Sequence, residues 1–180
     1  NIDYSTIGYF NIYLFDGPHE EKDQYEGVLI AQPALDNEYV LIVDDFIKKI
    51  GTALPNTDNI EELKLDNLHI SQGWFDSSVS LGEPGFEDRE TISNGLEVAA
   101  KSGFTAIALQ PNSFPVIDNQ AQVNFVKNKA NGFATQLFPI GALTKESEGK
   151  DMAELYDMKN SGAVAFGDYT KSLDNANLLK

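Results

Sequence analysis

The most constraining feature of the chain is a repeat of apolar runs and helix-like segments that begins near residue 67. Between the apolar runs, apolar residues recur three and four positions apart, as in amphipathic helices. Gly103, Gly132 and Gly162 each follow such a segment, where a helix commonly ends in a left-handed residue. The repeat therefore predicts βαβ units and a parallel sheet. The predicted strands recur roughly every 25–32 residues and span 74–79, 104–109, 136–143 and 162–166.

The repeat alone leaves the closure of the sheet open. Residues 74–180 hold four strand–helix units, whereas a closed eight-fold barrel usually needs about 250 residues. By length alone, the units also fit a four-stranded doubly wound layer. Residues 175–180 resemble the start of a fourth helix.

Residues 1–66 follow a different pattern. Short apolar or alternating runs, separated by turn residues, predict antiparallel strands at 7–15, 27–31, 39–43 and 46–50. A polar linker over 52–66 leads to a further strand at 63–70. We therefore expect two parts, an N-terminal β segment over 1–66 and a strand–helix part over 67–180.

Charge and composition narrow the classes of function. The 180 residues carry a formal net charge of −15, and the pI is near 4.3. Nucleic acids and anionic membrane surfaces are bound by basic patches, so neither is an expected partner. No apolar run approaches the ~18 residues that a membrane span needs, and without cysteine there are no disulfides or thiolate metal sites. No secretory signal is visible, so a cytoplasmic location is expected.

The most specific motif runs from Trp74 to Glu90 and reads Trp-Phe-Asp-Ser-Ser-Val-Ser-Leu-Gly-Glu-Pro-Gly-Phe-Glu-Asp-Arg-Glu. It resembles the signature of dihydroorotases, cyclic-amide hydrolases of the amidohydrolase superfamily, in which the first barrel strand ends in Asp-x-His-x-His-Leu-Arg-Glu-Pro-Gly. The positions that fit the signature are Asp76, Leu81, Glu83, Pro84 and Gly85. The positions that differ are Ser78 and Ser80, in place of the two histidines, and Gly82, in place of the arginine.

Further motifs follow in the order found in that family, so the resemblance extends from about Asn67 to Asp168. It implies an α/β fold, the first half of an amidohydrolase-type (β/α)8 barrel, preceded by a small N-terminal β-sandwich segment. The supporting motifs occupy residues 85–92, 99–105, 110–119, 139–145 and 162–168.

The metal site that the resemblance implies lacks its usual ligands. Ser78 and Ser80 have the same parity on their strand, so both can point into the mouth of the barrel. Family members bind zinc through histidines there, whereas a neutral serine hydroxyl is a poor zinc ligand. The only histidines, His19 and His69, do not lie at a predicted strand carboxyl end. We therefore expect no cofactor and no catalytic residue in this chain.

Two further positions have family equivalents. Asn112 matches an asparagine that helps hold the substrate carboxylate, together with the arginine that is Gly82 here. Asp168 matches an aspartate that bridges two metals in some members. Without the histidines, Asp168 is an isolated carboxylate and is expected to cap a helix or bind a loop.

Three functional hypotheses follow. The first is a dihydroorotase-like protein without catalysis, with a structural or regulatory role in pyrimidine biosynthesis, as a homo-oligomer or beside an aspartate transcarbamoylase-like subunit. The second is an active hydrolase of cyclic amide C–N bonds, with a reorganised metal site completed by residues outside this chain. The third is a small binding module unrelated to the family. Loss of two metal ligands and of the carboxylate-binding arginine favours the first, because water activation and substrate orientation are both lost.

Overall fold

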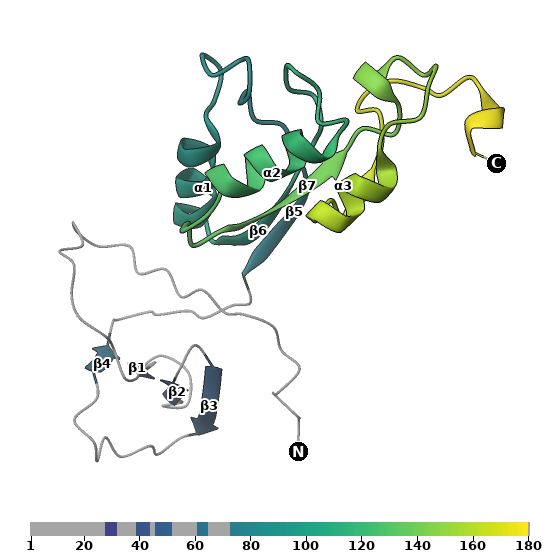
Figure 1. The fold of residues 1–180 in the computed structure, drawn as a ribbon. Helices are drawn as coiled ribbons and strands as arrows, with labels where there is room; N and C mark the ends of the chain where they lie inside the picture. The colour runs from purple at the N-terminus through teal and green to yellow at the C-terminus, as the bar shows by residue number, and fades with distance from the viewer. Residues whose placement is uncertain (1–27, 32–38, 44–45, 52–60, 65–72, 180) are drawn as a thin grey trace. The chain divides into compact units, whose positions relative to one another are not determined.

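The computed structural model describes residues 28–31, 39–43, 46–51, 61–64 and 73–179 (Figure 1). The chain divides into two units, Asn1–Gln72 and Gly73–Lys180. The strand predicted at 7–15, like His19 and His69, lies outside the described residues.

The described strands of the N-terminal unit form one sheet with the order β3-β2-β1-β4. Its strands are β1 (Val28–Ala31), β2 (Tyr39–Val43), β3 (Phe46–Gly51) and β4 (Glu61–Lys64). β2 pairs antiparallel with both β1 and β3, as the sequence predicts. β4 overlaps the start of the strand expected at 63–70 but pairs parallel with β1, which the local pattern does not reveal. Parallel pairing needs a longer crossover than a hairpin, so short-range turn signals do not specify it.

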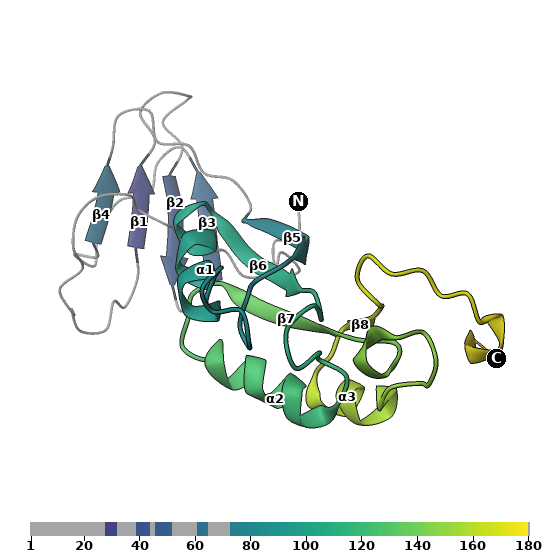
Figure 2. The same cartoon turned by 90° about the horizontal axis from the view of Figure 1, so that it is seen from above.

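The second unit is built on a parallel sheet with the order β5-β6-β7-β8, which confirms the predicted parallel architecture. Its strands are β5 (Trp74–Val79), β6 (Phe104–Leu109), β7 (Gln136–Gly141) and β8 (Ala165–Phe166). Each strand pairs with the next one along the chain, so the strand order never reverses as it does in a doubly wound sheet. The connecting helices lie along one side of the sheet (Figures 1 and 2).

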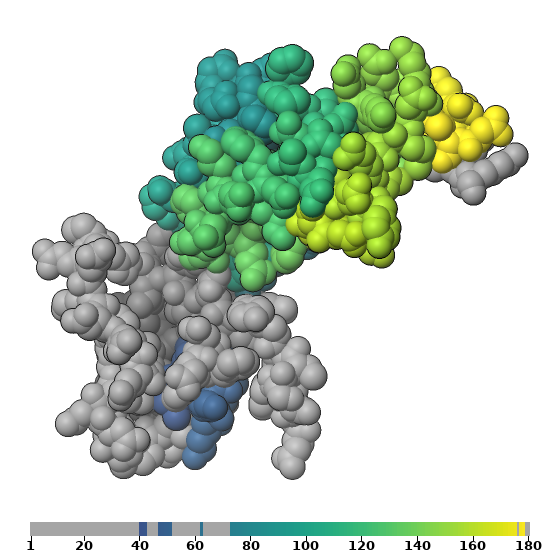
Figure 3. All heavy atoms as spheres, viewed as in Figure 1, coloured from purple at the N-terminus to yellow at the C-terminus, as the bar shows by residue number. Residues whose placement is uncertain are grey.

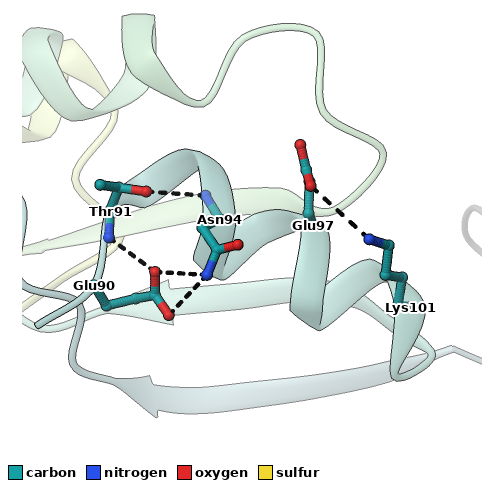
Figure 4. A network of polar contacts seen from close by, with 5 residues as sticks. All are labelled: Glu90, Thr91, Asn94, Glu97 and Lys101. Carbon is teal, nitrogen blue, oxygen red and sulfur yellow. Dashed lines mark hydrogen bonds and ion pairs between the residues drawn. The ribbon is translucent and has the colours of Figure 1, made fainter.

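Three helices connect these strands, α1 (Ile92–Lys101), α2 (Gln120–Lys129) and α3 (Leu155–Ser161). The Thr91 side chain accepts a hydrogen bond from the Asn94 backbone N–H and so caps α1 (Figure 4). Asn119 caps α2 in the same way, through the Gln122 N–H. The glycines expected after the helices all have left-handed backbones, with φ of 86° at Gly103, 86° at Gly132 and 108° at Gly162.

The segment before α3 differs from the prediction. The helical spacing starts at Met152, but this residue pairs with Thr144 in an isolated antiparallel bridge. A short 3-10 turn, η2 (Lys145–Ser147), lies inside this loop. The helix consequently begins at Leu155. A second 3-10 turn, η3 (Ala176–Leu179), stands where the sequence suggests a fourth helix.

The core of this unit lies between the sheet and its helices. β6 contributes Ile107 and Leu109, which are almost completely buried. They share one cluster with apolar residues from all three helices: Ile92, Leu96, Val123, Val126 and Met158. α2 and α3 are in contact and form a continuous surface (Figure 3), where Lys127 Nζ donates a hydrogen bond to Ser161 O at 3.0 Å. Among the described residues, no helix has the length and apolar character needed to cross a membrane.

Candidate functional site

The candidate site lies at the carboxyl ends of β5 and β6. Ser78 belongs to β5 and Ser80 follows it, while Gln110 and Asn112 follow β6. Parallel neighbours end at the same edge of a sheet, and ligands of α/β barrels bind at that edge. The β5–β6 register shifts between Asp76 and Val79, so regular strand pairing is interrupted beside Ser78.

Side-chain hydrogen bonds connect the two strand ends. Gln110 Nε2 donates to Ser78 Oγ at 3.1 Å, and Asn112 Nδ2 donates to Ser80 Oγ at 2.6 Å. Each serine oxygen thus accepts an amide N–H and keeps its own O–H to donate. We call these four side chains the hydroxyl–amide cluster. The sequence analysis missed Gln110, although its place directly after the predicted strand at 104–109, two residues before Asn112, would have indicated it.

Among the residues that the structure describes, the side-chain oxygen of Asn112 has no hydrogen-bond partner. The Oδ1 atom is buried, and no donor from the described residues reaches it. Leaving a buried acceptor unpaired costs about 1–3 kcal/mol, so native structures rarely do so without a reason. A donor from outside these residues would satisfy this atom.

Gly82 has no room for a side chain. Its N–H donates to Glu90 O at 3.0 Å, and its carbonyl accepts from Phe86 N at 2.8 Å. A Cβ atom at this position would lie 1.9 Å from Phe86 O. The backbone of the β5–α1 loop therefore fills the space that the family's arginine would need.

Glu83 holds this loop against the helices. The residue is 5% exposed, and its Oε2 accepts from Ile92 N, at the start of α1, at 2.9 Å. Oε1 lies 2.8 Å from Lys129 Nζ at the end of α2. The hydrogen bond to Glu83 raises the pKa of Lys129 above its ordinary value of 10.5. A carboxylate at a helix N-terminus is favourable, so Glu83 stabilises the fold here.

Asp168 organises the loop after β7. Its Oδ1 accepts from the Leu143 and Thr144 backbone N–H groups, both at 3.0 Å, and its Oδ2 accepts from Thr144 Oγ1 at 2.5 Å. Thr144 is fully buried, and its hydroxyl oxygen accepts in turn from Gly149 N at 2.8 Å. Both carboxylate oxygens are therefore engaged by the chain itself.

Zinc, the metal that the family resemblance implies, does not fit these residues. Tetrahedral zinc sites use imidazole, thiolate or carboxylate ligands. Ser78 and Ser80 offer neutral hydroxyls that already accept amide hydrogen bonds. The Asp168 carboxylate binds the loop after β7. In the described part of the chain, no three histidine, cysteine or acidic side chains gather in a group suited to a metal ion.

The chain is similar to known dihydroorotases. The family model described as dihydro-orotase-like matches residues 69–179, well over half of the chain. The dihydroorotase of Pelotomaculum thermopropionicum is 42% identical over 146 residues, and that of Ruminiclostridium cellulolyticum is 38% identical over 143 residues. The aligned parts cover 81% and 78% of this chain but only 34% and 33% of those enzymes. The chain thus spans about a third of the length of these relatives.

The fold is similar to that of a solved hydrolase. The L-hydantoinase (dihydropyrimidinase) from Arthrobacter aurescens aligns with a TM-score of 0.62 at 17% identity, over 77% of this chain and 32% of that one. This likeness supports the predicted class, an α/β fold with part of an amidohydrolase-type (β/α)8 barrel. With the family model and the curated relatives, it leads to one conclusion: the chain belongs to the dihydroorotase-like family of the amidohydrolase superfamily.

Proposed function

We propose that the protein carrying this chain is a dihydroorotase-like protein without dihydroorotase activity, with a structural or regulatory role in pyrimidine biosynthesis. The observation that supports this most directly is the hydroxyl–amide cluster. At the two histidine positions of the family signature, Ser78 and Ser80 accept hydrogen bonds from Gln110 and Asn112. Bulk water is too weak an acid to attack a cyclic amide at neutral pH, so hydrolysis needs a metal-activated water.

Substrate orientation is a second argument for the proposal. The family resemblance assigns the substrate carboxylate to an arginine at position 82 and an asparagine at position 112. Gly82 supplies no cation, and the loop backbone leaves no space for one. Asn112 remains, but its Nδ2 is used by Ser80. A carboxylate-bearing ring would be held less firmly, which lowers the rate even where a nucleophile is present.

The decisive experiment is an activity and metal assay on the protein at its natural length. We expect no turnover of dihydroorotate, no stoichiometric zinc after purification and no activity after zinc is added. The Ser78→His, Ser80→His double variant should gain zinc affinity relative to the unchanged protein. Turnover by the unchanged protein at about 1 s⁻¹ or faster, within the range of ordinary enzymes, would overturn the proposal. It would instead support a hydrolase whose metal site is completed by residues outside this chain.

The same proposal includes a partner and a location. An aspartate transcarbamoylase-like subunit is the expected partner, with a homo-oligomer as the alternative, and the cytoplasm is the expected compartment. Sedimentation of the natural-length protein, alone and with the transcarbamoylase of the same organism, measures the assembly. A species of higher mass in the mixture supports the partner, and an unchanged monomer peak contradicts both assemblies.

A further inference from the structure

Two asparagines of the chain are followed directly by glycine, in the pairs Asn94–Gly95 and Asn131–Gly132. Glycine has no side chain to shield its backbone nitrogen, so in such a pair this nitrogen can attack the side-chain amide of the asparagine. The attack requires a glycine N–H that is free of a hydrogen-bond acceptor and an asparagine side chain that can turn toward it. The two pairs differ in both respects.

The first pair is held within α1. Gly95 N donates to Thr91 O at 3.0 Å, so the potential nucleophile is already engaged. Asn94 Nδ2 donates to both carboxylate oxygens of Glu90, at 2.9 and 3.2 Å (Figure 4). A Cβ atom on Gly95 would lie 2.6 Å from Leu81 Cδ2, which shows that the backbone is closely packed here. A reaction at Asn94 must first break these contacts.

The second pair lies in the turn between α2 and β7. Asn131 and Gly132 are both exposed, and Gly132 has a positive φ of 86°. Nothing lies within 4 Å of a Cβ atom placed on Gly132. Within the described ranges of the chain, the Gly132 N–H donates to no acceptor and the Asn131 side chain has no hydrogen-bond partner. The nucleophile, the amide and water are therefore all available at this turn.

We propose that Asn131 deamidates spontaneously in the folded protein, whereas α1 protects Asn94. In the first step, Gly132 N forms a bond to Asn131 Cγ, the Cγ–Nδ2 bond breaks, and ammonia leaves with the proton of the Gly132 N–H. Water then opens the cyclic imide at one of its two carbonyl carbons. Opening at the backbone carbonyl gives isoaspartate, and opening at Cγ gives aspartate. Water is the only co-reactant, and nothing is oxidised or reduced.

The reaction adds a negative charge at a defined place. Asn131 and Lys127 line the same groove, and Lys127 Nζ connects α2 to α3 through Ser161 O. The new carboxylate thus shares a groove with a lysine that forms no ion pair with any acidic residue that the structure describes. The turn precedes β7 and so lies at the amino ends of the parallel strands, whereas the hydroxyl–amide cluster lies at their carboxyl ends. The inference is therefore independent of the proposed function.

The test measures both pairs in one sample. After the natural-length protein is incubated in mildly alkaline buffer, trypsin releases Asn131 in the peptide 130–145 and Asn94 in the peptide 90–101. Mass spectrometry gives the fraction of each peptide in which the amide has become an acid. An isoaspartate-specific methyltransferase with labelled S-adenosylmethionine detects the isomerised product.

We expect deamidation to be about tenfold faster or more at Asn131 than at Asn94, because hydrogen bonds must break before the attack at Asn94. In urea, where α1 is unfolded, the two rates should become similar. Equal rates in the folded protein would overturn the proposal. An Asn131 that stays intact in the folded protein, while the unfolded chain reacts at both pairs, would also overturn it.

Two matched variants identify the reacting amide. Asn131→Gln should suppress the reaction in the peptide 130–145, because glutamine would have to form a larger ring. Asn94→Gln makes the same change at the protected pair and should leave the rate in that peptide unchanged. Undiminished deamidation of the peptide 130–145 in Asn131→Gln would overturn the proposal, because another amide, such as that of Gln136, would then be the one that reacts.

Discussion

The Glu83 carboxylate lies 2.8 Å from Lys129 Nζ, so an ion pair connects the loop after β5 to the end of α2. The same carboxylate accepts from the first N–H of α1. One side chain therefore joins the loop beside the candidate site to two helices.

Replacing Glu83 by glutamine should destabilise the second unit. The charge-assisted hydrogen bonds to Ile92 N and Lys129 are weakened, and bonds to charged groups contribute about 1.5–3 kcal/mol each. Urea unfolding, followed by circular dichroism, measures the decrease in the free energy of unfolding. Glu97→Gln is the control, because its pair with Lys101 is exposed and 4.0 Å long. That change should cost less than about 0.5 kcal/mol, and equal costs for the two variants would contradict the role of Glu83.

The Glu83–Lys129 pair should make stability fall at high pH. The pKa of Lys129 is raised in the folded state by its hydrogen bond to Glu83, from an ordinary value of 10.5. A raised pKa means that the folded state holds the proton of Lys129 more tightly than the unfolded state does. The contribution of the ion pair to the free energy of unfolding is therefore complete below pH 10.5 and is lost as the pH rises through the folded pKa. The measurement is the difference in unfolding free energy between the wild type and Lys129→Met across this range. A difference that stays constant above pH 10.5 would refute the linkage.

Thr144→Val should loosen the loop after β7. Valine keeps the shape of the buried threonine but removes the hydroxyl that donates to Asp168 and accepts from Gly149 N. The expected cost is about 1–3 kcal/mol, because buried groups lose their partners. Relative to the wild type, hydrogen exchange at the Gly149 amide should accelerate more than exchange at the β6 amides. Thr135→Val is the matched control, since Thr135 is equally buried but donates to Phe104 O. Faster exchange at Gly149 in this control would show that the effect is not local.

Gly82→Ala should destabilise the β5–α1 loop. The added Cβ would meet Phe86 O at 1.9 Å, so the backbone must move. Overpacking of this kind costs typically about 1–3 kcal/mol. Gly167→Ala provides the comparison, because nothing lies within 4 Å of its added Cβ. Chemical unfolding should separate the two variants, and an unchanged stability of Gly82→Ala would mean that the loop adapts to the added Cβ.

The sequence predicts the parallel sheet well because its signals are local. The apolar runs at 74–79 and 104–109 coincide with β5 and β6, and Gly103, Gly132 and Gly162 adopt the positive φ expected after a helix. These features depend on the periodicity and backbone freedom of a few neighbouring residues.

Features that depend on distant partners are not visible in such patterns. The delayed start of α3 depends on Thr144, which pairs with Met152 and donates to Asp168, a residue 24 positions further along the chain. The parallel pairing of β4 with β1 likewise joins residues far apart in sequence. At the candidate site, the sequence indicates Ser78, Ser80 and Asn112, but only the three-dimensional arrangement shows that Asn112 donates to Ser80.

The hydroxyl–amide cluster also removes a source of pH sensitivity from this edge of the sheet. Histidine changes charge between about pH 5 and 8, whereas the serine hydroxyls and the side-chain amides of Gln110 and Asn112 do not titrate in that range. The hydrogen bonds that join β5 to β6 therefore keep the same donors and acceptors from a mildly acidic to a mildly basic medium. Two imidazoles at these positions would repel each other on acidification, and this edge avoids that repulsion.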